Sequence, residues 1–213
     1  MRLILVRHFR TQSNEARRIM GWGDAPPAQN WEEDLRLVDQ SLEQHHLVID
    51  AILSSDLGRA RETARYFARR RGLAGVESHL AFNEVNYGEL FDLDKDRACT
   101  AYPQFKTDPD YVFPGGESFR QMQARSQAQV QKLAARHLEG TLLLVAHAGV
   151  QVAQDVLDLA DHLRRKVSHR YIGDFQFQAG RCLRYDELGQ PSGFVRDGII
   201  ILPWNAPTTL TGH

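Results

Sequence analysis

The stretch Leu3-Ile-Leu-Val-Arg-His8 decides the fold of this protein, because a short apolar run stands at the start of the chain and ends in two polar residues. An uninterrupted apolar run of this length is typical of a strand buried on both faces. Ala51–Ser54 and Leu142–Val145 have the same form. Apolar residues then recur at helical spacing from Leu57 onward, and Gly72 is a stop signal. Alternating strands and helices predict an α/β fold, a three-layer sandwich with a mostly parallel central sheet flanked by helices.

The rest of the chain extends this pattern without an internal repeat. We expect one domain over residues 1–213, with residues 206–213 as a loose tail. The other segments are interpreted as helices from Glu117 to about His137 and from Val152 to Ala160, a loop from Trp22 to Trp31, an irregular polar segment covering a site from Asp92 to Asp110, and short β-like pieces between Phe175 and Leu202.

Composition narrows the class of partner. The 26 basic and 27 acidic residues nearly cancel, so we expect no nucleic-acid partner and no membrane partner. The apolar run Leu3–Val6 is too short for a signal-peptide core or a membrane span, and a cytoplasmic location is expected. Cys99 and Cys182 have no metal-site spacing and are interpreted as reduced thiols. We predict neither a metal nor a cofactor.

Polar residues follow three of the predicted strands. Arg7 and His8 follow the first strand, Arg59 opens the helix after the second, and His147 follows Leu142–Val145. Ligands of an open α/β sheet bind at the carboxyl ends of its strands, so these side chains are expected at one edge. Guanidinium groups match phosphate oxygens, and a neutral imidazole is a competent nucleophile. This set therefore predicts phosphoryl chemistry.

Five motifs occur in an order that resembles the histidine phosphatase superfamily, which includes the cofactor-dependent phosphoglycerate mutases. They are Leu5-Val-Arg-His-Phe-Arg-Thr11 with Asn14 after it, Ser54-Ser-Asp-Leu-Gly-Arg-Ala-Arg-Glu-Thr-Ala64, Asn83-Glu-Val-Asn-Tyr-Gly88, Pro114-Gly-Gly-Glu-Ser118 and Val145-Ala-His-Ala-Gly149. The resemblance implies a phosphoglycerate mutase-like fold and a phosphohistidine intermediate.

The same resemblance implies roles for individual residues. His8 accepts the phosphoryl group, and His147 holds its oxygens together with Arg7 and Arg59. Glu84 protonates the leaving oxygen and later deprotonates water, although Glu89 and Glu117 compete for this role. Asn14 is expected to bind substrate. The predicted site is therefore catalytic at His8, Glu84 and His147 and substrate-binding at Arg7, Arg59, Asn14 and Arg10.

Phe9 and Arg10 depart from the family pattern, which usually has Gly and then Glu or Gln after the nucleophile. Arg10 adds positive charge beside the site, which favours substrates with a second anionic group. The alternative is that Arg10 points to solvent or pairs with an acid while Phe9 packs.

Three functions remain open from the sequence. The first is a phosphatase acting without a metal on small phosphorylated metabolites. The second is a phosphoglycerate mutase, disfavoured by the short interval between Glu84 and His147. The third is a catalytically silent protein that binds a phosphorylated ligand. A homodimer is also left open.

Overall fold

The computed structural model describes residues 1–136, 139–150, 169–170, 172–178 and 181–188, and it confirms the predicted α/β fold. The sheet has the strand order β3-β2-β4-β1-β5-β6. Its strands are β1 (Arg2–Arg7), β2 (Ala51–Ser55), β3 (Glu77–His79), β4 (Thr141–Ala146), β5 (Ile172–Gln178) and β6 (Arg181–Leu188). The four strands β1 to β4 are mutually parallel, whereas β5 runs antiparallel to both β1 and β6.

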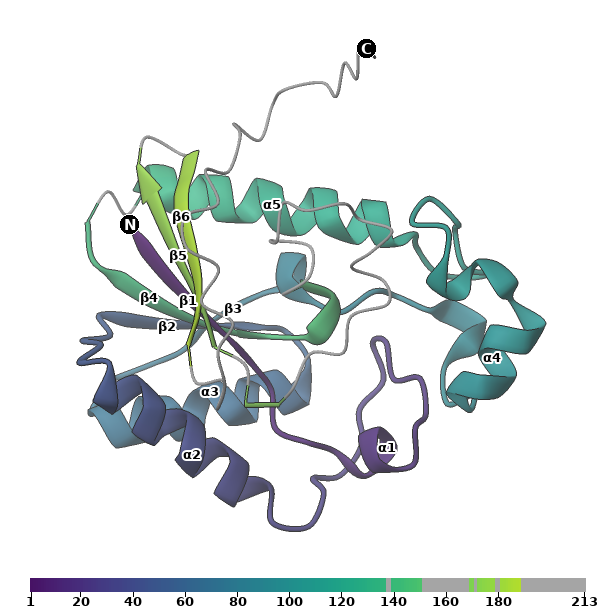
Figure 1. The fold of residues 1–213 in the computed structure, drawn as a ribbon, viewed down its shortest axis with the longest axis horizontal. Coiled ribbons are helices and arrows are strands. Elements are labelled where there is room, and N and C mark those ends of the chain that lie inside the picture. The colour runs from purple at the N-terminus through teal and green to yellow at the C-terminus, as the bar shows by residue number, and fades with distance from the viewer. Residues whose placement is uncertain (137–138, 151–168, 171, 179–180, 189–213) are drawn as a thin grey trace.

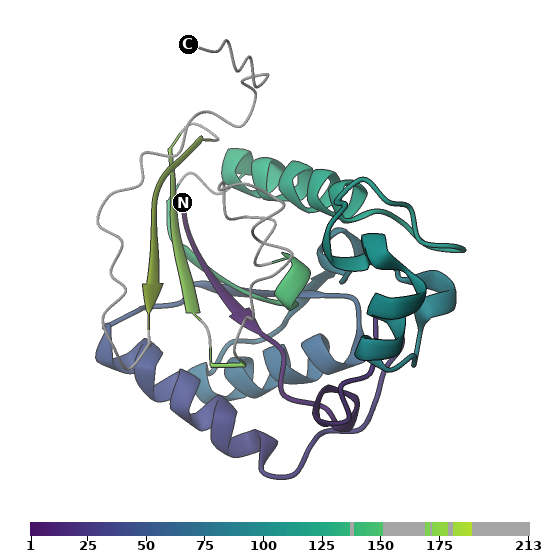
Figure 2. The ribbon, with the colours of Figure 1, turned by 45° about the vertical axis from the view of Figure 1, so that its right-hand side comes forward.

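Helices cover both faces of this sheet (Figures 1 and 2). Helices α2 (Trp31–Gln44) and α3 (Gly58–Arg71) lie on one face, and α5 (Phe119–Arg136) lies on the other. Because side chains alternate along a strand, Ile4 and Val6 of β1 pack towards α2 and α3, while Leu3 and Leu5 join the core beneath α5. The fold is thus the predicted three-layer sandwich, with β1 buried on both faces.

Strands β1, β2 and β4 and helices α3 and α5 begin and end close to their predicted bounds. Helix α3 ends before Gly72, and α5 begins after Ser118. The Ser118 hydroxyl accepts a hydrogen bond from Gln121 N at 3.1 Å, and the Gln121 side chain accepts one from Ser118 N at 2.8 Å, which together cap the helix. The predicted helix Val152–Ala160, the β-like Gly198–Leu202 and the tail at residues 206–213 lie outside the described residues.

The segment from Asp92 to Asp110 was predicted to be irregular, and this prediction was wrong. It contains helix α4 (Lys95–Ala101), because the Asp94 carboxylate caps the amide groups of Asp96 and Arg97. Strand β3 and the short helical elements were not predicted, because each has too few residues to show a hydrophobic period. These are α1 (Gln12–Glu15) and the 3₁₀ turns η1 (Leu80–Phe82), η2 (Gly88–Leu90) and η3 (Pro103–Lys106).

An ion-pair cluster joins the two helices on one face. Arg70 and Arg71 of α3 both pair with Asp39 of α2, whose carboxylate is almost fully buried. Arg70 stays exposed while Arg71 is largely covered, and both supply the compensating charge that a buried carboxylate needs. Phe67 of α3 is fully buried in the same layer, and truncating it to Ala would cost about 3–5 kcal/mol. Helix α3 is thereby fixed along the sheet with its first turn at the strand ends.

No helix among the described residues has both the length and the apolar character needed to cross a membrane. Cys99 is exposed and carries a free thiol.

Candidate active site

The sheet brings the predicted nucleophile and the second histidine together. In the register of β1 and β4, Val6 is opposite Val145 and Arg7 is opposite Ala146, so His8 and His147 leave neighbouring parallel strands at the same level. Their ring centroids are 5.0 Å apart. Both side chains are buried, as is the Arg59 side chain from the first turn of α3. The structure therefore collects at one edge three residues that are distant in sequence.

Two hydrogen bonds define the tautomer of His8. Its Nδ1 atom lies 2.5 Å from the carbonyl oxygen of Phe9, and a carbonyl can only accept, so Nδ1 carries the proton. The Nε–H group of Arg59 points at His8 Nε2 across 3.3 Å, and a guanidinium can only donate. The Nε2 lone pair therefore faces the cationic side of the site, as a nucleophile for a bound phosphoryl group requires.

The electrostatic surroundings keep the His8 ring neutral. Burial is the largest cause that lowers the pKa of His8 well below its usual value, and Arg59 and His147 lower it further. Arg7 and His169 act in the same direction. His8 is thus unprotonated on Nε2 throughout the neutral range, and the same cations would attract an anionic phosphoryl group.

A loop that precedes α2 holds Arg59 in place. The guanidinium donates hydrogen bonds to the carbonyl oxygens of Gly21 at 2.8 Å and Gly23 at 2.6 Å. Asp24 accepts from the amide groups of Gly58 at 3.0 Å and Arg59 at 3.3 Å, which caps the start of α3. Gly23 and Asp24 belong to the predicted Trp22–Trp31 loop, and no sequence signal indicated the contacts of this loop with Arg59.

The Glu84 carboxylate contacts the backbone of its own segment and the backbone that follows His147. One carboxylate oxygen accepts from Val85 N at 3.0 Å, and the other accepts from Gly149 N at 3.3 Å. A Cβ at Gly149 would stand 2.1 Å from the carboxylate, so only glycine permits this approach two residues after His147. Burial lowers the pKa of both arginines, that of Arg7 to about 10, and the negative charge of Glu84 opposes this effect at each of them.

Glu89 and Glu117, the two alternatives to Glu84 for the acid role, have different surroundings from Glu84. Glu89 is exposed. Glu117 forms a two-point ion pair with Arg125, with distances of 2.7 and 3.0 Å, and also accepts from Asn86 N at 2.9 Å. Arg125 in turn donates to the carbonyl oxygen of Glu84 at 2.9 Å. Glu117 therefore braces the backbone that carries Glu84, and Glu84 remains the candidate acid.

The two residues that follow His8 take different positions. Phe9 is buried and packs on Trp31, with ring centroids 4.8 Å apart. Arg10 is about two-fifths exposed and makes only long ion pairs, 3.4 Å to Asp34 and 3.7 Å to Glu15. Phe9 thus has a core position on the α2 side, while Arg10 lies at a partly open surface.

The Asn14 side chain makes hydrogen bonds within the protein. Its Oδ1 accepts from Thr11 N at 3.1 Å, while Asn14 N donates to the Thr11 hydroxyl at 3.2 Å, which caps α1. The same Oδ1 lies 3.1 Å from Nε2 of His169. The predicted substrate-binding residue is therefore also a structural anchor beside His8.

His169 is a site residue that sequence reasoning missed. Its ring centroid lies 5.7 Å from that of His8, with the two planes at 78°. It precedes β5, which runs antiparallel to β1 with Ile172 opposite Val6. The start of an antiparallel strand meets the end of its parallel neighbours, so His169 arrives at the same edge. The position of His169 follows from the direction of β5, and no sequence motif surrounds the residue to indicate it.

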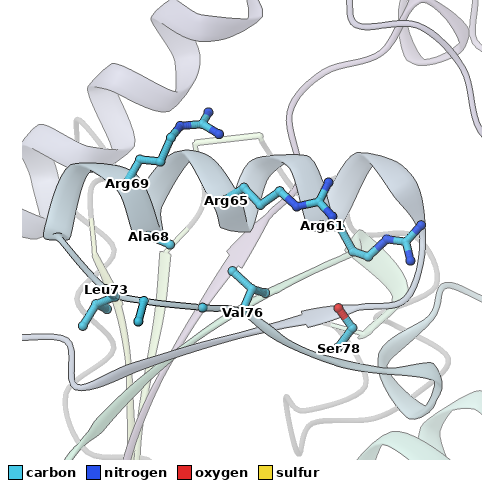
Figure 3. A pocket seen from close by; sticks show the side chains of 9 residues that line it. Arg61, Arg65, Ala68, Arg69, Leu73, Val76 and Ser78 are labelled. Atoms are coloured by element: carbon cyan, nitrogen blue, oxygen red, sulfur yellow. The ribbon is translucent and has the colours of Figure 1, made fainter.

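A separate hollow lies on the outer side of α3 (Figure 3). The cavity measures about 290 Å³ and is lined by Arg61, Arg65, Arg69 and Val76 among others. Arg61 pairs with Asp56 at 3.3 Å and Arg65 pairs with Glu62 at 2.6 Å, so two of the three arginines are already neutralised. It contains none of the site residues. Across the described ranges, no group of three or more His, Cys, Asp or Glu side chains is positioned to hold a metal ion.

Comparisons with known proteins agree with this geometry. A relative named 2,3-bisphosphoglycerate-dependent phosphoglycerate mutase, from Parvibaculum lavamentivorans, is 29% identical over 207 residues, covering 93% of this chain and 96% of the relative. One of the same name from Bradyrhizobium diazoefficiens is 32% identical over 155 residues, covering 69% and 75%.

The solved structure of a mycobacterial glucosyl-3-phosphoglycerate phosphatase with VO3 has a TM-score of 0.72 at 25% identity, covering 82% of this chain and 92% of that one. The family model of the histidine phosphatase superfamily (branch 1) matches residues 3–167, which include all five motifs. The chain therefore belongs to the histidine phosphatase superfamily.

Proposed function

We propose that this protein is a phosphatase that hydrolyses small phosphate monoesters through a phosphohistidine on His8. The observation that carries the proposal is the neutral His8 ring, whose Nδ1 is bonded to Phe9 and whose Nε2 faces the Arg59 guanidinium. A nucleophile of defined tautomer beside buried cations suits phosphoryl transfer, which depends on positioning and charge stabilisation. Binding a phosphorylated ligand without catalysis requires neither a nucleophile nor Glu84, so their presence disfavours a catalytically silent binding protein.

In the first step, His8 Nε2 attacks phosphorus and the bond from phosphorus to the ester oxygen breaks. The leaving alkoxide takes a proton from the Glu84 carboxyl group. Arg7, Arg59 and the imidazole of His147 hold the phosphoryl oxygens. The Nδ1 atom of His147 is buried and, among the described residues, has no hydrogen-bond partner, so it is available to a phosphoryl oxygen.

In the second step, water attacks phosphorus on the opposite side from His8. The Glu84 carboxylate takes a proton from this water, the bond between phosphorus and Nε2 breaks, and inorganic phosphate leaves. The His8 lone pair is restored, and Glu84 is again a carboxylic acid ready for the next ester. Water and ester are consumed, and alcohol and phosphate are formed.

Phosphoglycerate mutase activity is the second candidate, and the names of the sequence relatives favour it. The short interval between Glu84 and His147 does not discriminate, because the Parvibaculum relative carries the mutase name although this chain covers 96% of its length. The similar mycobacterial structure is named a phosphatase. In a mutase the phosphohistidine transfers its phosphoryl group to a second hydroxyl instead of to water.

One assay separates these activities. Purified protein is incubated with a panel of phosphate monoesters, including 3-phosphoglycerate with and without 2,3-bisphosphoglycerate, and both phosphate release and isomerisation are measured. We expect phosphate release, and a loss of several orders of magnitude in His8→Ala. Isomerisation without phosphate release would favour the mutase, and near-normal turnover by His8→Ala would contradict both.

We expect activity without a divalent metal ion, because Arg7 and Arg59 supply the positive charge that magnesium supplies in many phosphoryl-transfer enzymes. The measurement is turnover with and without a chelator. Activity that is abolished by the chelator and restored by one divalent ion would contradict the proposal.

A further inference from the structure

His169 lies beside the nucleophile, and its hydrogen-bonding state can be deduced. The Asn14 atom that faces Thr11 N at 3.1 Å must be the amide oxygen, because a backbone N–H can only donate. The same oxygen lies 3.1 Å from His169 Nε2, so that nitrogen must carry a proton and donate. Thr11 thereby fixes the orientation of Asn14, and Asn14 fixes the tautomer of His169.

The remaining ring nitrogen, Nδ1, then carries the lone pair as long as the ring is neutral. Burial lowers the pKa of His169 to about 2, and the positive charges of Arg7 and Arg10 act in the same direction. Lys95 adds to this effect. His169 is therefore neutral at any physiological pH, with one nitrogen that donates to Asn14 and one that accepts.

Besides the nucleophile His8, the acceptor already described in this site is the Glu84 carboxylate, which accepts from Val85 N and Gly149 N. Arg7 and Arg59 present only donors, and His147 offers the partnerless Nδ1 described above. These groups suit phosphoryl oxygens but cannot accept a hydrogen bond from a hydroxyl group of the substrate. The His169 ring is half-buried and stands edge-on to His8 at 5.7 Å between centroids, within reach of an ester whose phosphoryl group is held at His8.

We propose that His169 is a specificity-determining residue whose Nδ1 accepts a hydrogen bond from a hydroxyl group near the ester oxygen, so that the substrates are phosphate esters of polyols, sugars or hydroxy acids. The inference rests on the proposed phosphatase function and narrows its substrate class. His169 lies outside residues 3–167, the part of the chain that the family model matches.

The test compares glycerol 1-phosphate with propyl phosphate, which lacks the two hydroxyl groups. We expect the wild-type protein to have a higher kcat/KM for glycerol 1-phosphate than for propyl phosphate. His169→Phe should reduce this preference by about tenfold, which is the upper end of the effect expected from the loss of one neutral hydrogen bond. Phe keeps a ring against His8, and the measured quantity is the ratio of the two kcat/KM values, which an equal loss of activity on both substrates leaves unchanged. His169→Gln, which retains an acceptor, should recover part of the preference.

Asn14→Asp provides a second test that leaves the ring in place. A carboxylate at position 14 can still accept from Thr11 N and His169 Nε2, but it favours a protonated ring, in which Nδ1 becomes a donor. A substrate hydroxyl group can still accept a hydrogen bond from this N–H, so Asn14→Asp should retain more of the preference for glycerol 1-phosphate than His169→Phe does. An unchanged preference in His169→Phe would overturn the inference, while wild-type protein inactive on every ester would instead refute the proposed phosphatase function and the inference with it.

Discussion

The hydroxyl group of Ser55 lies 2.6 Å from Nε2 of His147, and the same oxygen accepts a hydrogen bond from Leu57 N at 3.3 Å. A hydroxyl group that accepts from the amide can still donate its own proton, and we infer that it donates this proton to the imidazole. His147 then carries its proton on Nδ1, the buried atom that has no partner among the described residues. With the proposed function, Ser55 would set the tautomer in which His147 donates to a phosphoryl oxygen.

Replacing Ser55 with Ala should lower kcat/KM about tenfold, because the His147 proton is then free to move to Nε2. The matched control is Ser54→Ala, whose hydroxyl contacts Ser78 at 3.0 Å on the other side of the strand. ¹⁵N NMR of the His147 ring measures the tautomer directly. If Ser55→Ala and Ser54→Ala lose activity equally, with the ring shifts unchanged, Ser55 has no role in setting the tautomer.

Glu84→Gln should slow alkyl phosphates by about 10²–10⁴-fold and nitrophenyl phosphate far less, because a leaving alkoxide needs a proton and a leaving nitrophenolate does not. The check is kcat/KM on both substrates. Glu117→Gln is the control, since Glu117 pairs with Arg125 and braces the Glu84 backbone. That variant should affect both substrates alike. A substrate-selective loss in Glu117→Gln alone would transfer the acid role to Glu117.

Arg10→Gln should reduce the preference for esters that carry a second anionic group by about tenfold, the value of one charge-assisted contact at a partly exposed position. The long distances from Arg10 to Asp34 and Glu15 leave its guanidinium able to turn towards a ligand. Arg36→Gln, at a surface arginine paired with Glu33, removes the same net charge elsewhere. Equal effects of the two variants would show that Arg10 acts only through net charge.

The free energy of unfolding should fall as the pH drops from about 6.5 to 5. His8, His147 and His169 all have a lowered pKa in the folded protein, so the unfolded chain binds more protons in this range. Stability then rises with pH by about 1.4 kcal/mol per pH unit for each histidine. Chemical denaturation at several pH values in this range measures the slope of the unfolding free energy against pH. His169→Phe should reduce this slope by the contribution of about one bound proton. A flat profile would contradict the neutral, buried state of these rings.

The sequence alone determined the architecture, and it predicted which residues meet at the candidate site. Apolar runs such as Leu3–Val6 are too short and too uniform for a surface element, so they specify buried parallel strands. The polar residues after them, including His8 and His147, then fall at one edge by topology. Local signals also sufficed for α3 and α5, because their apolar spacing and their Gly and Ser boundaries act within a few residues.

The tertiary structure decided what each side chain does there. The tautomers of His8 and His147 depend on Arg59 and Ser55, which lie far away in the chain, so no local pattern encodes them. The same holds for Glu117, which braces the segment of Glu84 through Arg125. His169 reaches His8 only because β5 runs antiparallel to β1. Hydrogen-bond direction and burial exist only once the sheet edge is assembled. They decide which nitrogen of each histidine carries a proton, and the identity of the residue alone does not decide this.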